Sequence, residues 1–209
     1  MILSKHIAHL SFLNADCIFL VSNCRFKEFN FLFRETKFKI IPLKEFSKIE
    51  IPETGTSYEE NAFLKAKRAN EISGLPALAD DSGLEVKFLK NEPGIYSARY
   101  SGKNASDERN NKKLLKKMIN TPKREAKYIS VLFFYDPNND IELYTYGELN
   151  GTIGKSEIGD KGFGYDPLFK IKNSNQTMAQ ISFKKRMELS HRSLSVQKML
   201  NELSKLQNK

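Results

Sequence analysis

The sequence is poor in cysteine and has no long apolar run, and these two absences exclude several classes of protein. Its two cysteines, Cys17 and Cys24, have no second pair to join, so we expect neither a disulfide framework nor a thiolate zinc site. Such cysteine usage fits a reducing compartment, the cytoplasm. No apolar stretch approaches the roughly 18 residues that a membrane span needs, and residues 1–16 show no signal-peptide cleavage pattern. We therefore expect a cytoplasmic protein without membrane contact.

The chain also lacks internal repeats, low-complexity segments and long linkers, which favours a single domain. Its 209 residues are 40% hydrophobic, enough for one sizeable core or for one core with a small attached lobe. We expect residues 1–16 to be an N-terminal extension and residues 17–209 to form the domain.

Positive charge is what the chain has in excess, with a formal net charge of +9. Such a surplus attracts polyanions, which include nucleic acid, membrane surfaces and phosphorylated small molecules. One lysine cluster on a predicted helix is typical of a solvated helix face and consists of Lys112, Lys113, Lys116 and Lys117.

Hydrophobic periodicity predicts alternating strands and helices. Strands are expected over residues 18–21, 38–41, 77–79, 84–88, 126–135, 141–149, 151–156 and 169–171. Helices are expected from residue 24 to about 35, over 57–70, from 106 to about 120 and from 190 to about 206. The early units resemble parallel βαβ units and the later strands form an antiparallel hairpin. This order indicates a mixed sheet in an α/β or α+β fold, with two lobes about a cleft.

Asp80 and Asp81 form the most informative pair in the chain, because they follow a short apolar stretch over residues 75–79. We expect that strand to end at the pair, at the rim of the sheet where α/β proteins place their chemistry. Adjacent like charges repel unless a cation or a proton lies between them, and Mg²⁺ is the cation that leaves room for substrate phosphates. Taken alone, however, the run Asp-Ser-Gly also indicates a simple turn.

A second candidate region is the loop between the first strand and the first helix, with Ser22, Asn23, Arg25 and Lys27. Backbone N–H groups at a helix N-terminus bind anions, and a following cation completes a phosphate site. The loop contains no glycine, and a plain turn explains it equally well.

A third region joins a loop carboxylate to a helix. Glu53 precedes a helix that Ser57 and Glu60 begin with a capping box. Glu60, Asn61 and Lys65 share one face of that helix. Two interpretations stay open here: Lys65 faces a ligand, or it is only the salt-bridge partner of Glu60.

The fourth region combines a glycine-rich loop with the start of the last helix. Phe163 lies between two glycines, which suits a stacking platform for a flat ring rather than a core position. His191 and Arg192 offer fixed donors for carbonyl or phosphate oxygens, although a helix-cap role explains His191 alone.

Five motifs in their order resemble the inosine triphosphate pyrophosphatase family, also called the Ham1-like or non-standard purine nucleoside triphosphate pyrophosphatases. They are TGTSYEENA (54–62), ADDSGLEV (79–86), PGIYSARYSG (93–102), GFGYDP (162–167) and SHR (190–192). The resemblance extends from about residue 18 to residue 203. It implies an α/β fold with a long mixed central sheet flanked by helices and two lobes about an active-site cleft. It further implies a cytoplasmic, Mg²⁺-dependent homodimer that hydrolyses ITP, dITP and XTP to the monophosphate and pyrophosphate and so cleanses the nucleotide pool.

The resemblance also implies roles for individual residues. Asp81 would be the proton acceptor and a metal ligand, with Glu53 and Asp80 completing the metal site. Lys65 would face the phosphates. The remaining implied substrate contacts are Ser82, the base loop Phe163, Gly164, Tyr165 and Asp166, and the base-reading pair His191 and Arg192.

Two departures from the family pattern bear on substrate binding. Without a gap, Lys27 takes the lysine position of the first loop, whereas a two-residue deletion places Arg25 there and brings Glu28 into register with the family's later glutamate. Both alignments stay open. Arg186 stands where the family usually has lysine, and its forked guanidinium is no neutral replacement, while Lys185 could substitute only by a shift in register.

Three competing hypotheses remain beside the pyrophosphatase. The chain could be a related pyrophosphatase with altered base preference, a nucleic-acid-binding protein that uses its positive charge, or a catalytically weakened relative that only binds nucleotides. The intact carboxylates Glu53, Asp80 and Asp81 argue against the last hypothesis, and we do not expect nucleic acid to be the main partner.

Overall fold

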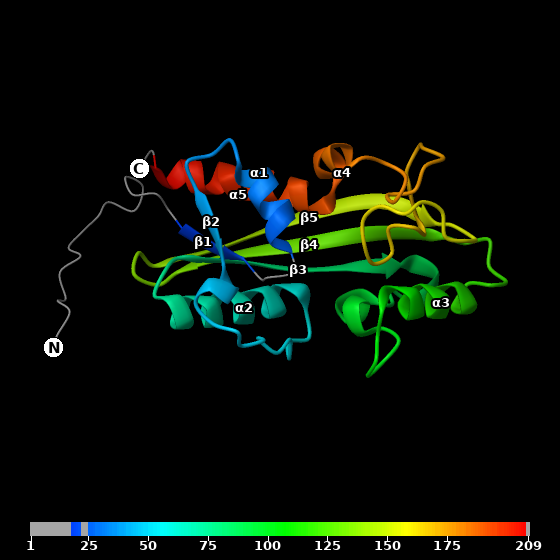
Figure 1. Cartoon of the computed structure of the whole chain (residues 1–209), viewed down its shortest axis with the longest axis horizontal. Helices are drawn as coiled ribbons and strands as arrows, with labels where there is room; N and C mark the ends of the chain where they lie inside the picture. The colour runs from blue at the N-terminus through cyan, green and yellow to red at the C-terminus, as the bar shows by residue number, and fades with distance from the viewer. Residues whose placement is uncertain (1–17, 22–24, 208–209) are drawn as a thin grey trace.

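The computed structural model describes residues 18–21 and 25–207 of the chain, and it contains one large and one small sheet (Figure 1). The large sheet is antiparallel, in the order β3 (Ala77–Val86), β4 (Glu125–Asp136), β5 (Ile141–Ile153) and β6 (Phe169–Ile171). The small sheet pairs β1 (Ile18–Val21) with β2 (Lys39–Pro42) in parallel. The described helices are α1 (Phe26–Phe33), α2 (Tyr58–Ser73), α3 (Asp107–Lys117), α4 (Phe183–Leu189) and α5 (His191–Gln207).

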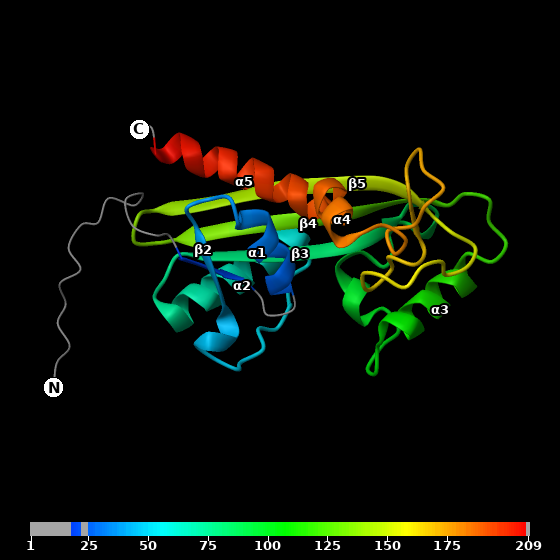
Figure 2. The ribbon, with the colours of Figure 1, turned by 45° about the horizontal axis from the view of Figure 1, so that its top comes forward.

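Helices cover both faces of the large sheet. Figures 1 and 2 show α2 and α3 on one side and α1, α4 and α5 on the other. The core under α1 and α5 contains Phe29, Phe33, Leu78, Leu132, Phe134, Val196, Met199 and Leu203. The core under α2 contains Tyr58, Ala62, Ala66, Ala79, Ile129, Val131 and Phe133. The expected α/β class with helices flanking a sheet is confirmed. The prediction of one mixed sheet was wrong, because in the described residues the parallel pair β1 and β2 forms a sheet separate from the antiparallel one.

The prediction of a turn at Asp80 and Asp81 was wrong. Ten consecutive residues of β3 pair with β4, and this pairing includes Asp80 with Leu132 and Asp81 with Val131. Gly83 does not form a turn. A Cβ at this position would lie 2.4 Å from the carbonyl oxygen of Gly94. Close packing against the neighbouring 3₁₀ helix Gly94–Arg99 therefore explains this glycine, and both carboxylates lie inside a central stretch of strand.

Two further boundaries differ from the expectation. Residues 141–156 were predicted as two strands, but β5 is continuous because all its residues up to Thr152 pair with β4. Helix α4 was not predicted as a separate helix; it begins at a Ser182 cap whose side chain accepts from the Lys185 N–H at 3.2 Å. The hairpin of β4 and β5, helices α2, α3 and α5, and the loop before β6 are confirmed.

The predicted capping box is half formed. The Ser57 hydroxyl accepts from the Glu60 N–H at 3.1 Å, as expected for an N-cap. The Glu60 carboxylate accepts a hydrogen bond from the Thr56 N–H at 2.8 Å rather than from the Ser57 N–H. Glu60 is thus a capping residue, and Lys65 is not its partner.

Some predictions concern residues that the structure does not describe. The N-terminal extension (1–16) and two members of the first loop, Ser22 and Asn23, lie outside the described residues. In the described ranges no helix has the length and apolarity that a membrane crossing requires.

Candidate functional site

Asp80 and Asp81 point to opposite faces of β3, because successive side chains of a strand alternate. Asp80 contacts Ser130 and Arg192, whereas Asp81 contacts Asn61 and Lys65 on helix α2. The two adjacent carboxylates therefore belong to two different clusters. We call Asp80 and its partners the arginine cluster, which consists of Asp80, Glu28, Ser82, Ser130 and Arg192. We call Asp81 and its partners the lysine cluster, which consists of Asp81, Glu53, Asn61, Lys65 and Arg99.

The lysine cluster is built by helix α2 and the loop before it. The Nζ of Lys65 donates to the Oδ1 of Asp81 at 2.8 Å and to the Oε1 of Glu53 at 2.9 Å. Asn61 Nδ2 donates to the other Asp81 oxygen at 3.2 Å. Arg99 Nη1 donates to the second Glu53 oxygen at 2.6 Å. Two cations and two carboxylates thus balance each other in a partly enclosed site.

The charges of the lysine cluster shift each other's pKa values. Burial, helped by the negative charges of Glu53 and Asp80, outweighs Lys65 and raises the pKa of Asp81 to about 6. Burial lowers the pKa of Lys65, but the Asp81 and Glu53 carboxylates outweigh it, so the net shift is upward. Burial alone would raise the pKa of Glu53, and Lys65 with Arg99 lower it overall. The lysine is therefore held protonated, and Asp81 titrates close to neutral pH.

The lysine cluster fits a hard cation in donor chemistry. Glu53 and Asp81 both direct an oxygen at one point, where the Lys65 ammonium now lies. One or two carboxylates with phosphate oxygens and water are the donor set that Mg²⁺ prefers. Over the described ranges no group of three or more His, Cys, Asp or Glu side chains converges as a complete metal cage, so such an ion would share its coordination with substrate or solvent.

The arginine cluster occupies the opposite face of β3. Arg192, at the start of α5, is 4% exposed and pairs with Asp80 through Nε at 3.0 Å and with Glu28 of α1 through Nη1 at 3.3 Å. It also donates to the Ser82 hydroxyl. Ser130 completes the shell of Asp80 by donating at 2.6 Å. Burial raises the pKa of Asp80, but Arg192 and Ser130 outweigh burial and the net shift is downward.

This placement separates Asp80 from the other two predicted metal ligands. Its oxygens are engaged by a buried guanidinium and a hydroxyl on the arginine side. The structure brings Glu53 and Asp81 together, and it does not support the prediction that Asp80 ligates the same ion.

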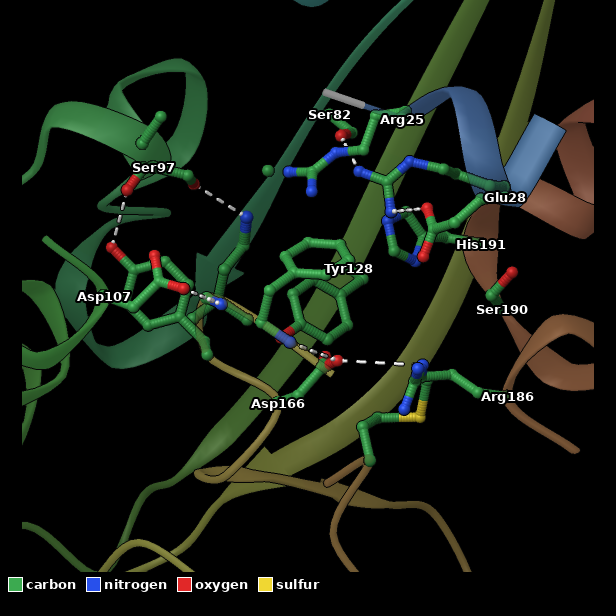
Figure 3. Close-up of a pocket in the computed structure, with 18 of the residues that line it drawn as sticks. Arg25, Glu28, Ser82, Ser97, Asp107, Tyr128, Asp166, Arg186, Ser190 and His191 are labelled. Atoms are coloured by element: carbon green, nitrogen blue, oxygen red, sulfur yellow. Dashed lines mark hydrogen bonds and ion pairs between the residues drawn. The ribbon is translucent and has the colours of Figure 1, made fainter. Parts of the chain in front are cut away.

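A cavity of about 140 Å³ opens beside the arginine cluster (Figure 3). Figure 3 shows Arg25 and Ser82 at one end and Asp166 and Arg186 at the other, with Tyr128 between them. Its walls come from α1, β3, β4, α3, the loop before β6, α4 and the start of α5. The predicted residues that line it are Arg25, Ser82, Phe163, Gly164, Tyr165, Asp166, Arg186, His191 and Arg192.

The buried carboxylate of Asp166 holds the base loop predicted around Phe163. Asp166 accepts from the Phe163 N–H at 3.3 Å and from the Tyr128 hydroxyl at 3.1 Å. Gly162 has a φ of +82°, and a Cβ there would lie 2.0 Å from Asp166 Oδ2, so this glycine is required by both conformation and space. Burial raises the pKa of Asp166 to about 6.

The other side of the loop is held by α3 and the turn before it. Gly164 N–H donates to Asp107 at 2.6 Å, and Asn111 donates to the Gly164 carbonyl at 3.1 Å. The Tyr165 hydroxyl donates to the Ser97 carbonyl at 2.9 Å. These contacts fix the loop so that Phe163 lines the cavity together with its neighbours.

Several buried polar nitrogens at the cavity have no hydrogen-bond partner in the protein. Both ring nitrogens of His191 and two nitrogens of Arg186, Nε and Nη1, are in this state. Arg186 approaches Asp166 only at 4.0 Å. Unsatisfied buried polar groups are costly, so these atoms indicate a polar ligand.

His191 is kept neutral and its ring is fixed in orientation. It stacks on Tyr128, with ring centroids 4.8 Å apart and an interplanar angle of 16°. Burial, followed by the charges of Arg192 and Arg25, places the pKa of His191 well below its ordinary value. A neutral imidazole carries one donor and one acceptor, whereas a helix-cap role would leave no reason to bury it.

The geometry distinguishes the two alignments of the first loop. Arg25 and Glu28 line the cavity, whereas Lys27 is exposed and lies 5.1 Å from the ring centroid of Phe183. The alignment with the deletion is therefore the one that agrees with the structure. Lys185 is also exposed and pairs with Glu188 at 3.8 Å, so Arg186 holds the cavity position.

Sequence reasoning overlooked four supporting residues. Tyr128 has the pattern of an ordinary strand aromatic, and its position on β4 does not indicate that its ring stacks on His191. Asp107 looked only like a first-turn helix acid. Glu28 entered only through an alignment, and Arg99 was noted inside a motif without a role. No local pattern reveals these partners, since each acts on a residue distant in sequence.

The chain is similar in sequence to a known protein family. The model of the Ham1 family matches residues 18–202. A dITP/XTP pyrophosphatase from Vibrio parahaemolyticus is 42% identical over 170 residues, covering 80% of this chain and 85% of that protein. One from Staphylococcus aureus is 44% identical over 143 residues, with 68% and 73% covered.

Solved structures show the same similarity. The Staphylococcus aureus Ham1 protein superposes with a TM-score of 0.80 at 36% identity, covering 90% of this chain and 98% of that one. A HAM1 protein from Coxiella burnetii gives 0.82 at 33% identity, with 90% and 99% covered.

Proposed function

Because this chain belongs to the Ham1 family, we propose that it hydrolyses non-standard purine nucleoside triphosphates (ITP, dITP and XTP) to the monophosphate and pyrophosphate. Relatives named dITP/XTP pyrophosphatase support this substrate class. The main support is the placement of two sites on opposite faces of β3. One face meets a cavity with unpartnered polar nitrogens, and the other meets the lysine cluster, which suits phosphates. Among the described residues β3 is the edge strand of the large sheet, so a nucleotide lying across that edge would contact both faces.

The cavity supplies the recognition of a 6-oxo purine. Phe163 offers a ring face for the base, and aromatic stacking tolerates any flat ring. Neutral His191 and the unpartnered nitrogens of Arg186 offer hydrogen-bond donors, and a carbonyl oxygen in the place of the adenine amino group can accept from them. A site built for such an acceptor rejects the wrong base strongly, because its buried donors would stay unpaired.

The lysine cluster supplies the groups for hydrolysis. The oxygen of a water molecule bonds to the α-phosphorus, the bond from that phosphorus to the bridging oxygen breaks, and pyrophosphate leaves with the electron pair. The water proton goes to the Asp81 carboxylate, whose pKa of about 6 suits a base that works near neutral pH. Lys65 is held protonated and stabilises the negative charge of the leaving group.

We infer that the metal of this reaction is Mg²⁺, held by Glu53 and Asp81. When bound, this ion would neutralise part of the triphosphate charge. Asp80 keeps Arg192 in place instead of ligating the ion. The substrate contacts proposed for Ser22, Asn23 and Lys27 concern a loop whose first two members lie outside the described residues.

The decisive experiment is pyrophosphate release from ITP, XTP, GTP and ATP, with and without Mg²⁺. We expect metal-dependent release from ITP and XTP and little from GTP or ATP. Asp81→Asn serves as the control for a contaminating hydrolase, because it retains the shape of the side chain and loses the base. A folded protein that releases pyrophosphate from none of them would contradict the proposal and favour the binding-only relative.

The lysines of helix α3 do not favour the nucleic-acid hypothesis. Three lysines of the α3 cluster are engaged within the protein: Lys112 with Glu108, Lys113 with the Tyr100 carbonyl and Lys117 with Glu92. The homodimer and the cytoplasmic location stay predictions from the resemblance; sedimentation and cell fractionation would test them.

A further inference from the structure

Tyr128 lines the cavity from β4 and is connected to two of its proposed base-binding parts (Figure 3). Its ring stacks on the imidazole of His191, with an interplanar angle of 16°. Its hydroxyl donates to Asp166 at 3.1 Å, and the same carboxylate accepts from the Phe163 N–H. One tyrosine therefore links the histidine on α5 with the loop that carries Phe163.

The backbone of His191 is fixed by contacts that do not involve its ring. A Cβ on Gly147 of β5 would lie 1.8 Å from the His191 carbonyl oxygen, so this glycine lets the first turn of α5 lie directly on the sheet. In the same helix, Ser195 Oγ lies 2.9 Å from Ser130 Oγ, and the Ser195 carbonyl accepts from Thr145 at 2.8 Å. These contacts fix the position of the His191 backbone, but they leave the plane of the imidazole open.

The plane of the His191 ring is set by packing. Neither ring nitrogen has a hydrogen-bond partner among the described residues, so no hydrogen bond within them orients the imidazole. The torsion that turns such a ring is broad, and a stacked neighbour restricts it. Tyr128 is that neighbour, and its own ring is held by the hydroxyl contact to Asp166 and by Phe169, whose ring centroid lies 4.4 Å away. Tyr128 is only 7% exposed, so it is a rigid support for the histidine.

We propose that Tyr128 is a positioning residue, which holds the imidazole of His191 and the loop of Phe163 in one fixed arrangement that receives the purine base. This inference rests on the proposed function, since it assumes that the base binds in this cavity. A ligand that must meet several groups binds more tightly when those groups are fixed before it arrives, because binding does not have to order them.

Tyr128 acts on the binding of the base and not on the bond that breaks. Two residues further along β4, Ser130 contacts Asp80, and side chains two apart on a strand share one face. Asp81 and Lys65 meet on the opposite face of β3. Loss of the Tyr128 contacts should therefore weaken substrate binding and leave the groups of the lysine cluster in place.

Tyr128→Phe is the test, because it removes the hydroxyl and retains the ring. We would measure ITP binding by isothermal titration calorimetry in an Asp81→Asn background, which prevents turnover. ITP should bind roughly 2- to 12-fold more weakly, the factor that one hydrogen bond typically contributes. Inorganic tripolyphosphate has no base, so its affinity should be unchanged. Tyr128→Leu also loses the stacked ring and should weaken ITP binding by a further factor of roughly 2 to 12.

The matched control is Tyr100→Phe. It also removes a tyrosine hydroxyl that donates to a carboxylate, that of Glu92 at 2.9 Å. Tyr100 is not among the described residues that line the cavity, so its substitution should leave ITP binding unchanged. A tyrosine with a purely structural role at position 128 would behave in the same way as this control.

Three results would overturn the inference. The first is equal affinity for ITP, or no binding, in Tyr128→Phe and its parent. The second is an equal loss of ITP and tripolyphosphate binding, which would indicate a general disturbance of the fold. The third concerns kinetics with Asp81 intact, where Tyr128→Phe should raise KM for ITP and change kcat by less than about twofold; a fall of kcat equal to that of kcat/KM would assign Tyr128 to the transition state. Failure of the proposed function is separate, since it shows as absent ITP hydrolysis by the wild type.

Discussion

The two faces of β3 carry adjacent aspartates that differ in their partners and in the direction of their pKa shifts. Asp80 is surrounded by a buried arginine and a hydroxyl, and the net shift of its pKa is downward. Asp81 shares one lysine with a second carboxylate, and its pKa rises to about 6. Each aspartate shares its cation with a glutamate, but Asp80 also accepts a hydrogen bond from the Ser130 hydroxyl, whereas the charges of Glu53 and Asp80 add to burial in raising the pKa of Asp81. The comparison teaches that a carboxylate becomes a base when its environment leaves its charge incompletely compensated.

The largest expected effect belongs to Asp81→Asn. Loss of a positioned general base typically costs roughly 100- to 10,000-fold in rate, and the amide retains the side-chain volume. We expect kcat for ITP to fall within that range while the thermal midpoint changes little. Pyrophosphate release and thermal denaturation measure the two quantities. Near-normal turnover would show that the base is another group.

The opposite result is expected for Asp80→Asn, which should reduce the free energy of unfolding while changing kcat much less than Asp81→Asn does. Removing one partner of a buried ion pair costs about 3–5 kcal/mol, and we expect the lower end because Glu28 still pairs with Arg192. Urea unfolding measures the loss. Glu148→Gln is the control, since its pair with Lys127 is exposed. If Asp80→Asn lost activity at full stability, the distinction between the two faces would fail.

The ion pair of Asp80 also gives wild-type stability a pH dependence. Because the pKa of Asp80 is lowered in the folded protein, its contribution is present above the ordinary aspartate pKa of about 3.9. It is lost as the pH falls toward the lowered folded-state value. Asp80→Asn should remove this part of the acid sensitivity, which urea unfolding at several pH values below 5 would show as a flatter curve.

A smaller effect is expected in the pH profile of the reaction. Burial raises the pKa of Asp81 to about 6 and a bound Mg²⁺ would lower it, so at saturating Mg²⁺ kcat/KM should fall about tenfold for each pH unit below an inflection that lies under pH 6. Because the Asp80 charge contributes to raising that pKa, the inflection should move to lower pH in Asp80→Asn. Rates measured from pH 4.5 to 8 test both statements. A profile without an inflection in this range would assign the limiting proton transfer elsewhere.

The smallest effect is expected for Arg99→Gln. Arg99 pairs with Glu53 at 2.6 Å, but its side chain is 40% exposed, and exposed ion pairs contribute about 0.2–1 kcal/mol. The KM for ITP should therefore change by less than roughly fivefold. Steady-state kinetics decide the point. A much larger loss would mean that Arg99 touches the substrate and that the lysine cluster extends further than its present contacts.

Sequence reasoning was most successful where the signal is local. Ser57 caps the helix that it was expected to begin, and Ser106 caps the helix predicted from residue 106, because a cap binds an N–H only three residues away. The antiparallel hairpin of β4 and β5 was likewise recognised from strand propensity and a short turn. The glycines around Phe163 indicated a loop, and Gly162 indeed adopts a positive φ.

Where sequence reasoning failed, the partner lay far along the chain. Asp-Ser-Gly indicated a turn, yet pairing with β4 about 50 residues away keeps those residues extended. Two alignments of the first loop were equally good until the contacts of Arg25 and Lys27 could be compared. Local pattern could not decide either case, because the competing structures differ only in distant contacts.

The chemistry of the site shows the same division. The order of motifs along the chain was enough to indicate the family, the loop that presents Phe163 and the acidic pair, since these depend on residue type and spacing. It could not say that Asp80 would meet Arg192, which is 112 residues away, while Asp81 meets Lys65. Strand alternation sends the two carboxylates to opposite faces, and folding alone brings a different cation to each, which sets their pKa values and hence their separate roles.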